Sequence, residues 1–320
     1  MAAQKGNTVV VYAALAGNLL NAITKLVAAV FTGSSAMISE GIHSLVDTGN
    51  EVLLLYGLHR ASRPPDAGHP LGHGRELYFW SFVVALLIFA IGAGVSIYEG
   101  ALHMMAPEPM VSPVANYVVL ALSALFEGVS WTTALREFNK QRGTLGYLEA
   151  IRKSKDPTTF TVLVEDTVAL IGLAVAFVGI LASQLFDDAR LDGVASIGIG
   201  LLLAATATFL ARESKKLLIG EQALPEVREA ILQLAAADAN IRAVNGVITM
   251  QLGPDQVIAA LSAEFADHLS ADDIEQTIER LEVAIRGDTP EVTALFVKPQ
   301  SRRVWKGRVE QMREASKEDG

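Results

Sequence analysis

The sequence contains no cysteine among its 320 residues. A chain without cysteine has no disulfide, no thiolate metal ligand and no thiol nucleophile, so His, Asp and Glu are the ligand types that remain. Charged residues are also scarce, at 19% of the chain against 51% hydrophobic residues. Most acidic residues lie from about residue 213 onward, so the net charge of -9 describes mainly that part. No basic surface is indicated, and we expect no nucleic-acid partner.

Long apolar runs fill the first two thirds of the chain. Stretches of about twenty residues, the length that crosses a ~30 Å hydrocarbon core, indicate an α-helical membrane domain over residues 1–212. Residues 1–8 lack the features of a cleaved signal or transit peptide, so the first helix is expected to be its own insertion signal. The six predicted transmembrane helices are residues 8–31, 35–58, 77–100, 113–135, 159–184 and 192–211.

Lysine and arginine are unevenly distributed between these spans. They follow the second, fourth and sixth spans, whereas the alternate loops carry essentially Arg190 alone. By the positive-inside rule, both termini and the loops 59–76 and 136–157 are cytosolic. The high alanine content and the lack of a transit peptide favour a bacterial cytoplasmic membrane, so we predict a multi-pass protein of that membrane.

The sequence pattern changes after Lys216. Helical periodicity and β-like runs alternate here, and they predict a small cytosolic α+β domain over residues 213–300 with the order α-β-β-α-β, ferredoxin-like. The charged residues 301–320 are expected to be a disordered, loose tail. The predicted helices are 224–237 and 270–286, and the predicted strands are 241–252, 256–265 and 291–298.

Ionisable residues interrupt the second and fifth spans. Each costs several kcal/mol at bilayer depth unless it is paired or liganded, so each is a functional candidate. Glu40, His43, Asp47 and Glu51 are spaced so that they share one helix face. Lys25 in the first span could neutralise Glu40, which would make both residues structural.

The fifth span adds Glu165 and Asp166. At 1.5 Å per residue, Asp47 lies ~18 Å from the outer edge and Asp166 ~12 Å from the inner edge of a ~30 Å core. The two carboxylates therefore lie at the same depth in the membrane. His43, Asp47 and Asp166 are therefore candidate ligands of a divalent metal ion.

The loop between the second and third spans, residues 63–75, is rich in proline and glycine. Asp66, His69 and His73 follow one another there at spacings of three and four residues. This set could hold a second metal ion at the cytosolic side. Loop histidines are common, however, and Arg75 opposes a nearby cation.

These motifs resemble the cation diffusion facilitator family of metal/proton antiporters. The likeness rests on residues 39–47 in the second span and 69–75 in the loop, together with the six spans and the α+β domain. It implies a homodimer whose transport site combines His43 and Asp47 with Asp166. It also implies that Asp66, His69 and His73 match a loop site seen in some members.

The sequence departs from the family pattern in two places. Many members have a ligand four residues before the acid of the fifth span, where this chain has Val162. Glu165 is a candidate fourth ligand, and a water molecule or a transported anion is the alternative. This stretch resembles the subfamily that contains a mitochondrial zinc transporter. The strand positions that bind two zinc ions in some members are here Ser262, Phe296 and Lys298, so the domain is expected to serve dimerisation.

The resemblance and the ligand set predict a secondary transporter that exports zinc from the cytosol in exchange for protons by alternating access. An oxygen-rich set would also accept Mn²⁺, Fe²⁺ or Co²⁺. The alternatives are a membrane-embedded zinc enzyme and a non-transporting metal sensor. No HExxH pair, Walker-type loop or Gly-x-Ser-x-Gly motif supports an enzyme, and we expect no cofactor.

Overall fold

The computed structural model describes residues 2–107 and 113–318, and the chain forms two compact units. The first unit is a helical bundle that contains the chain up to Ser62 and Glu76–Lys216. The second is an α+β unit that contains Arg63–Arg75 and the chain from Leu217 onward. Residues 1 and 319–320, which the predicted membrane domain and tail include, lie outside the described residues.

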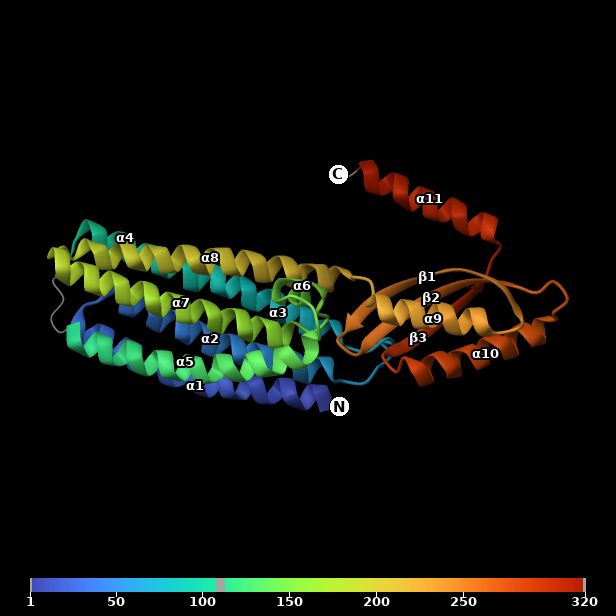
Figure 1. The fold of residues 1–320 in the computed structure, drawn as a ribbon, viewed down its shortest axis with the longest axis horizontal. Coiled ribbons are helices and arrows are strands. Elements are labelled where there is room, and N and C mark those ends of the chain that lie inside the picture. The colour runs from blue at the N-terminus through green and yellow to red at the C-terminus, as the bar shows by residue number, and fades with distance from the viewer. Residues whose placement is uncertain (1, 108–112, 319–320) are drawn as a thin grey trace. The chain divides into compact units, whose positions relative to one another are not determined.

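Long helices make up the bundle unit, and Figure 1 shows them running alongside one another. Both α1 and α7 pack against α2 and α5. The third predicted span consists of α3, the short π-helix η1 and α4, which follow one another without a break. The elements of this unit are α1 (Ala2–Thr32), α2 (Ser35–Ala61), α3 (Arg75–Leu87), η1 (Ile88–Ala93), α4 (Gly94–Met105), α5 (Pro113–Arg142), α6 (Tyr147–Lys153), α7 (Pro157–Phe186) and α8 (Arg190–Ile219).

Within the described residues, five helices are long and apolar enough to cross a membrane. They are Ala14–Thr32, Arg75–Met105, Val114–Lys140, Pro157–Phe186 and Arg190–Ile219. α2 has a sufficient length of 27 residues, but Glu40, Asp47 and Glu51 lower its hydropathy. It nevertheless lies in the bundle, in contact with α1, α4 and α7. The structure thus confirms a multi-pass helical membrane protein, with α2 as its polar member.

Local capping fixes the start of the two helices that carry the predicted site. Gly33 adopts a φ of +71° in the turn between α1 and α2, a conformation that favours glycine. Ser34 then caps α2 by accepting a hydrogen bond from the Met37 backbone N–H at 3.2 Å. Asp156 caps α7 by accepting from the Thr158 backbone N–H at 2.9 Å. Each cap satisfies a backbone donor that the first helical turn leaves unpaired.

The α+β unit has the predicted order of elements. β1 pairs with β2 antiparallel, and β2 pairs with β3 parallel, in the strand order β1-β2-β3. α9 and α10 contact each other and the sheet, and together they bury one apolar core. Ser270 and Asp273 form a capping box at the start of α10. The elements are α9 (Pro225–Ala237), β1 (Ile241–Gly253), β2 (Gln256–Phe265), α10 (Ala271–Asp288) and β3 (Val292–Pro299).

Two helices lie where the sequence predicts none. α11 (Arg302–Glu318) takes the place of the expected loose tail. Its anchor is Trp305, whose ring packs on β1 at Gly246, where an added Cβ would lie 2.6 Å from the ring. α6 is a short helix within the predicted loop 136–157. α6 has only seven residues, too few for a helical repeat to be recognised, and α11 lies in a stretch that is rich in charge and poor in apolar residues.

Candidate metal site

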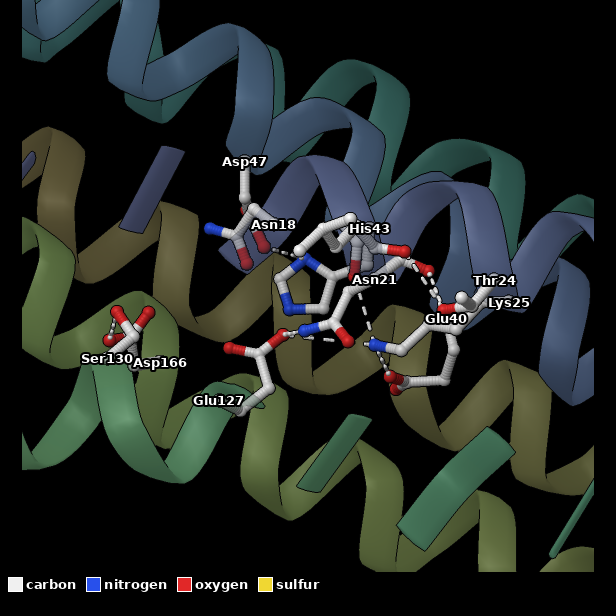
Figure 2. Close-up of polar contacts among 12 residues, drawn as sticks. Asn18, Asn21, Thr24, Lys25, Glu40, His43, Asp47, Glu127, Ser130 and Asp166 are labelled. Carbon is white, nitrogen blue, oxygen red and sulfur yellow. Dashed lines mark hydrogen bonds and ion pairs between the residues drawn. The ribbon is translucent and has the colours of Figure 1, made fainter. Parts of the chain in front are cut away.

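One face of α2 carries buried ionisable side chains, as the helical spacing predicts. Glu40, His43, Asp47 and Glu51 are each at most 2% exposed. Nδ1 of His43 lies 3.1 Å from Oδ2 of Asp47, yet neither ring nitrogen has a hydrogen-bond partner in the described chain. An imidazole and a carboxylate one helical turn apart, with unpaired ligand atoms, can supply half of a tetrahedral metal site. Figure 2 shows this pair.

Asp166 on α7 lies in the same buried region. Electrostatic interactions link it to Asp47 and His43, but its Oδ2 accepts a hydrogen bond from Ser130 Oγ at 2.7 Å (Figure 2). The ligand atoms of His43, Asp47 and Asp166 do not all lie within 4.8 Å of one another in the described structure. The three predicted ligands therefore lie in one region of the bundle, but their ligand atoms are not close enough together to bind one metal ion in this arrangement.

Glu165 faces a different partner from its neighbour Asp166. Its Oε1 accepts a hydrogen bond from Asn50 Nδ2 of α2 at 2.9 Å, and its Oε2 has no partner in the described chain. One turn earlier on α7, Val162 is fully buried and apolar. Glu165 therefore contacts Asn50 on α2, and its role as a fourth ligand stays a prediction.

Lys25 of α1 has the partner that the sequence predicts. Its Nζ lies 3.0 Å from Oε2 of Glu40, and it donates a hydrogen bond to Ser44 Oγ at 2.9 Å. Both charged side chains are fully buried. Pairing of this kind is what makes a buried ammonium tolerable.

Glu127 of α5 is a buried acid that the sequence analysis missed. It is 1% exposed, and its Oε1 accepts a hydrogen bond from Asn21 Nδ2 at 2.9 Å. Lys25 Nζ is 3.9 Å from the same oxygen. The sequence could have predicted Glu127, because an acid inside a predicted span carries the same cost of burial in the membrane that identified the acids of α2.

The middle of the described bundle contains more carboxyl groups than cations. One buried ammonium, that of Lys25, faces several buried acids, and most of these acids have an oxygen without a hydrogen-bond partner in the described chain. Since isolated carboxylates are very costly to bury, this interior favours bound cations or protons. The acids are Glu40, Asp47, Glu51, Glu127, Glu165 and Asp166.

The loop residues Asp66, His69 and His73 form a compact cluster in the α+β unit. Their ligand atoms all lie within 4.8 Å of one another, which no other described group of three achieves. Asp66 Oδ1 is 3.3 Å from His69 Nδ1, and Asp66 Oδ2 is 3.0 Å from His73 Nε2. Two imidazoles and a carboxylate are a common ligand set for zinc.

Asp66 is held as an anion by its surroundings. Hydrogen bonds from the His73 ring and from the backbone N–H groups of His69 and Gly68 lower the pKa of Asp66 to about 2. The loop turns at Gly72, which has a φ of +85° and brings the second histidine back to the aspartate. A ligand that is charged at every physiological pH is ready to bind a cation.

Comparison with known proteins places the chain in a family. Residues 11–219 match the family model described as the cation efflux transmembrane domain. The chain is 35% identical over 263 residues to a Xenopus laevis protein named proton-coupled zinc antiporter SLC30A9, mitochondrial, a match that covers 82% of this chain and 47% of the relative. The human protein of that name is 31% identical over 301 residues, covering 92% and 52%.

A bacterial relative matches over most of both chains. The cation-efflux pump FieF of Cronobacter sakazakii (strain ATCC BAA-894) is 27% identical over 278 residues, covering 83% of this chain and 87% of the relative. By contrast, this chain spans about half the length of the SLC30A9 relatives. The higher identity to those relatives agrees with the resemblance of the fifth span to the mitochondrial zinc transporter subfamily. The chain thus belongs to the cation efflux, or cation diffusion facilitator, family.

Proposed function

We propose that this protein exports a divalent transition-metal ion from the cytosol in exchange for protons, and that zinc is its main substrate. The observation that carries the proposal is the His43–Asp47 pair, which lies with unpaired ligand atoms in a buried interior rich in carboxyl groups. Membership of the cation efflux family supports transport of this kind. Relatives named as a proton-coupled zinc antiporter and a cation-efflux pump support both the coupling and the substrate.

His43 and Asp47 of α2 and Asp166 of α7 are the proposed transport ligands. Binding requires Asp166 to leave Ser130 and approach the α2 pair, so the described arrangement is an open form of the site. A metal ion binds only neutral imidazole and ionised carboxylates. Protons and metal therefore compete for the same atoms, and alternating exposure of the site to the two sides would couple their opposite movements.

The ligand chemistry favours zinc among the divalent metals. Imidazole suits zinc and cobalt better than magnesium or calcium, while the surrounding carboxylates would also accept manganese or iron(II). We therefore rank Zn²⁺ first and propose that Mn²⁺, Fe²⁺ and Co²⁺ are competing substrates.

Asp66, His69 and His73 are proposed to bind a second divalent ion. This cluster belongs to the α+β unit and uses side chains distinct from those of the transport site. The complete protein is proposed to be a homodimer of a cytoplasmic membrane, with both termini and the α+β unit in the cytosol.

Transport into proteoliposomes tests the proposal. With an acidic lumen, the reconstituted protein should take up zinc as protons leave, and dissipating the pH gradient should stop uptake. Asp47→Asn and Asp166→Ala should each reduce uptake at least about tenfold, whereas the matched control Glu137→Gln, near the C-terminal end of α5, should not. Equal uptake with and without the gradient, or full activity of Asp166→Ala, would contradict the proposal.

A further inference from the structure

The proposed transport site lacks one ligand of a four-coordinate set. Zinc prefers four ligands in a tetrahedral arrangement, whereas α2 and α7 supply His43, Asp47 and Asp166. The position one turn before Asp166 is the buried Val162. Given the proposed function, on which this inference rests, we infer that Glu127 of α5 is the fourth metal ligand.

The depth of Glu127 in the bundle follows from its hydrogen bonds. Thr32 Oγ1 donates to Asn116 Oδ1 at 2.8 Å, which sets the end of α1 level with the start of α5. Glu127 lies eleven residues after Asn116, or ~16 Å along the helix. Asn21 lies the same distance back along α1 from Thr32, and the 2.9 Å hydrogen bond between Asn21 and Glu127 confirms that the two are level.

This depth lies between the two ligands of α2. α2 begins at Ser35, next to the end of α1, so His43 lies ~12 Å and Asp47 ~18 Å from that end of the bundle. Glu127 at ~16 Å falls between them. Glu127 accordingly interacts electrostatically with both His43 and Asp47. In the view of Figure 2, the carboxylate of Glu127 points toward the His43 ring.

α5 also reaches Asp166 from the same face. Ser130 follows Glu127 by three residues, a spacing that places both on one side of a helix, and Ser130 holds Asp166 by a 2.7 Å hydrogen bond. One face of α5 therefore meets the ligands of both α2 and α7.

The other buried acids do not fit this position. By the same arithmetic, Glu40 lies ~8 Å and Glu51 ~24 Å along the bundle, outside the interval between the α2 ligands. Glu165 adjoins Asp166 and lies near the same level, but the two side chains point about 100° apart around α7, and Oε1 of Glu165 accepts a hydrogen bond from Asn50. Among the described acids outside the α2 and α7 motifs, only Glu127 lies between the levels of His43 and Asp47.

The ion pair with Lys25 leaves one carboxylate oxygen of Glu127 without a partner in the described chain. The Lys25 ammonium already has Glu40 Oε2 at 3.0 Å and Ser44 Oγ at 2.9 Å, whereas Glu127 Oε1 is 3.9 Å away. Glu127 Oε2 has no hydrogen-bond partner in the described chain. One oxygen of Glu127 is thus oriented by Asn21, and the other is available to a metal ion.

Zinc titration of the full-length protein in nanodiscs tests the inference. A His69→Ala/His73→Ala background removes the loop cluster, so that only the bundle binds metal. Glu127→Gln should weaken zinc binding at least about tenfold, and Glu127→His, which restores a ligand but no charge, should return affinity to within about threefold of the parent. Glu127→His should also raise the preference for zinc over manganese, because imidazole replaces an oxygen ligand.

The controls separate a ligand from a counterion and from the function itself. Glu137→Gln is the matched substitution elsewhere on α5 and should leave affinity unchanged. If Glu127→His binds as weakly as Glu127→Gln, Glu127 only balances Lys25 and the inference is wrong. If Glu127→Gln binds like the parent while Asp47→Asn loses affinity, the inference fails but the proposed function stands. If Asp47→Asn also binds normally, the proposed site fails as a whole.

Discussion

At the scale of single residues, the buried ion pair of Lys25 and Glu40 predicts a large effect of mutation on stability. Both side chains are fully buried, and their charged atoms are 3.0 Å apart. Removing one member of such a pair leaves an uncompensated charge, which costs about 3–5 kcal/mol. Lys25→Met should therefore lower the melting temperature of the purified protein, as followed by fluorescence-detected gel filtration after heating.

Two further variants test whether this loss comes from charge. Lys25→Met/Glu40→Gln should recover much of the stability, because no unpaired charge remains. Lys140→Met breaks an ion pair with Glu137 in which the lysine side chain is 71% exposed, and it should change the melting temperature little. A double variant no more stable than Lys25→Met would contradict this account.

The loop cluster should bind metal independently of the bundle. In Asp47→Asn, one zinc ion per chain should remain bound, and adding His69→Ala and His73→Ala should remove it, as counted by elemental analysis after desalting. Because the pKa of Asp66 is about 2, acidification to pH 4 leaves this carboxylate charged. Metal released at that pH would therefore not reflect protonation of Asp66. Retention of zinc by the combined variant would place the second ion elsewhere.

The sequence was informative about which residues lie buried and less so about their partners. The cost of burying charge identified the acids of α2 and α7 and the Lys25–Glu40 pair. It did not predict that Ser130 would hold Asp166 or that Asn21 would hold Glu127. Those contacts depend on the rotation of α1 and α5 about their axes, which the weakly periodic apolar spans do not specify.

At the scale of elements, α4 and α8 approach each other through small residues. An added Cβ on Gly100 would lie 2.6 Å from the Gly193 carbonyl oxygen, and Gly200 is similarly close to Ile97. Gly100→Ala should therefore push the helices apart and destabilise the protein by about 1–3 kcal/mol. Gly128→Ala is the matched control, since nothing lies within 4 Å of its added Cβ. Equal thermal stability of both variants would argue against close packing.

The capping box of α10 predicts a dependence on pH. Hydrogen bonds from the Ser270 hydroxyl and backbone N–H lower the pKa of Asp273. A lowered pKa means that the cap stabilises the folded state above the ordinary pKa of aspartate and that this contribution disappears as pH falls below it. Ser270→Ala should cost about 1 kcal/mol. Hydrogen exchange in the first turn of α10 should then be roughly fivefold faster near neutral pH, while α9 is unchanged.

Element boundaries were predictable where periodicity was strong. The strands and the helices α9 and α10 lie within a few residues of their predicted positions. α2 was predicted as one of the six apolar stretches, residues 35–58, although its hydropathy is below that of the other spans. α11 was missed because its contact with β1 rests on Trp305, a tertiary contact between segments about 60 residues apart.

At the scale of the whole molecule, the homodimer that the family resemblance implies is predicted to form through the α+β unit. β3 is an edge strand of the sheet, and Phe296 on it is 59% exposed. An apolar side chain on an unpaired edge favours contact with another chain. Native mass spectrometry should detect a dimer of the full chain, and deletion of residues 214–320 should yield monomers. Asp47→Asn, which alters only the bundle, should remain dimeric; a dimeric truncated bundle would instead locate the interface in the membrane helices.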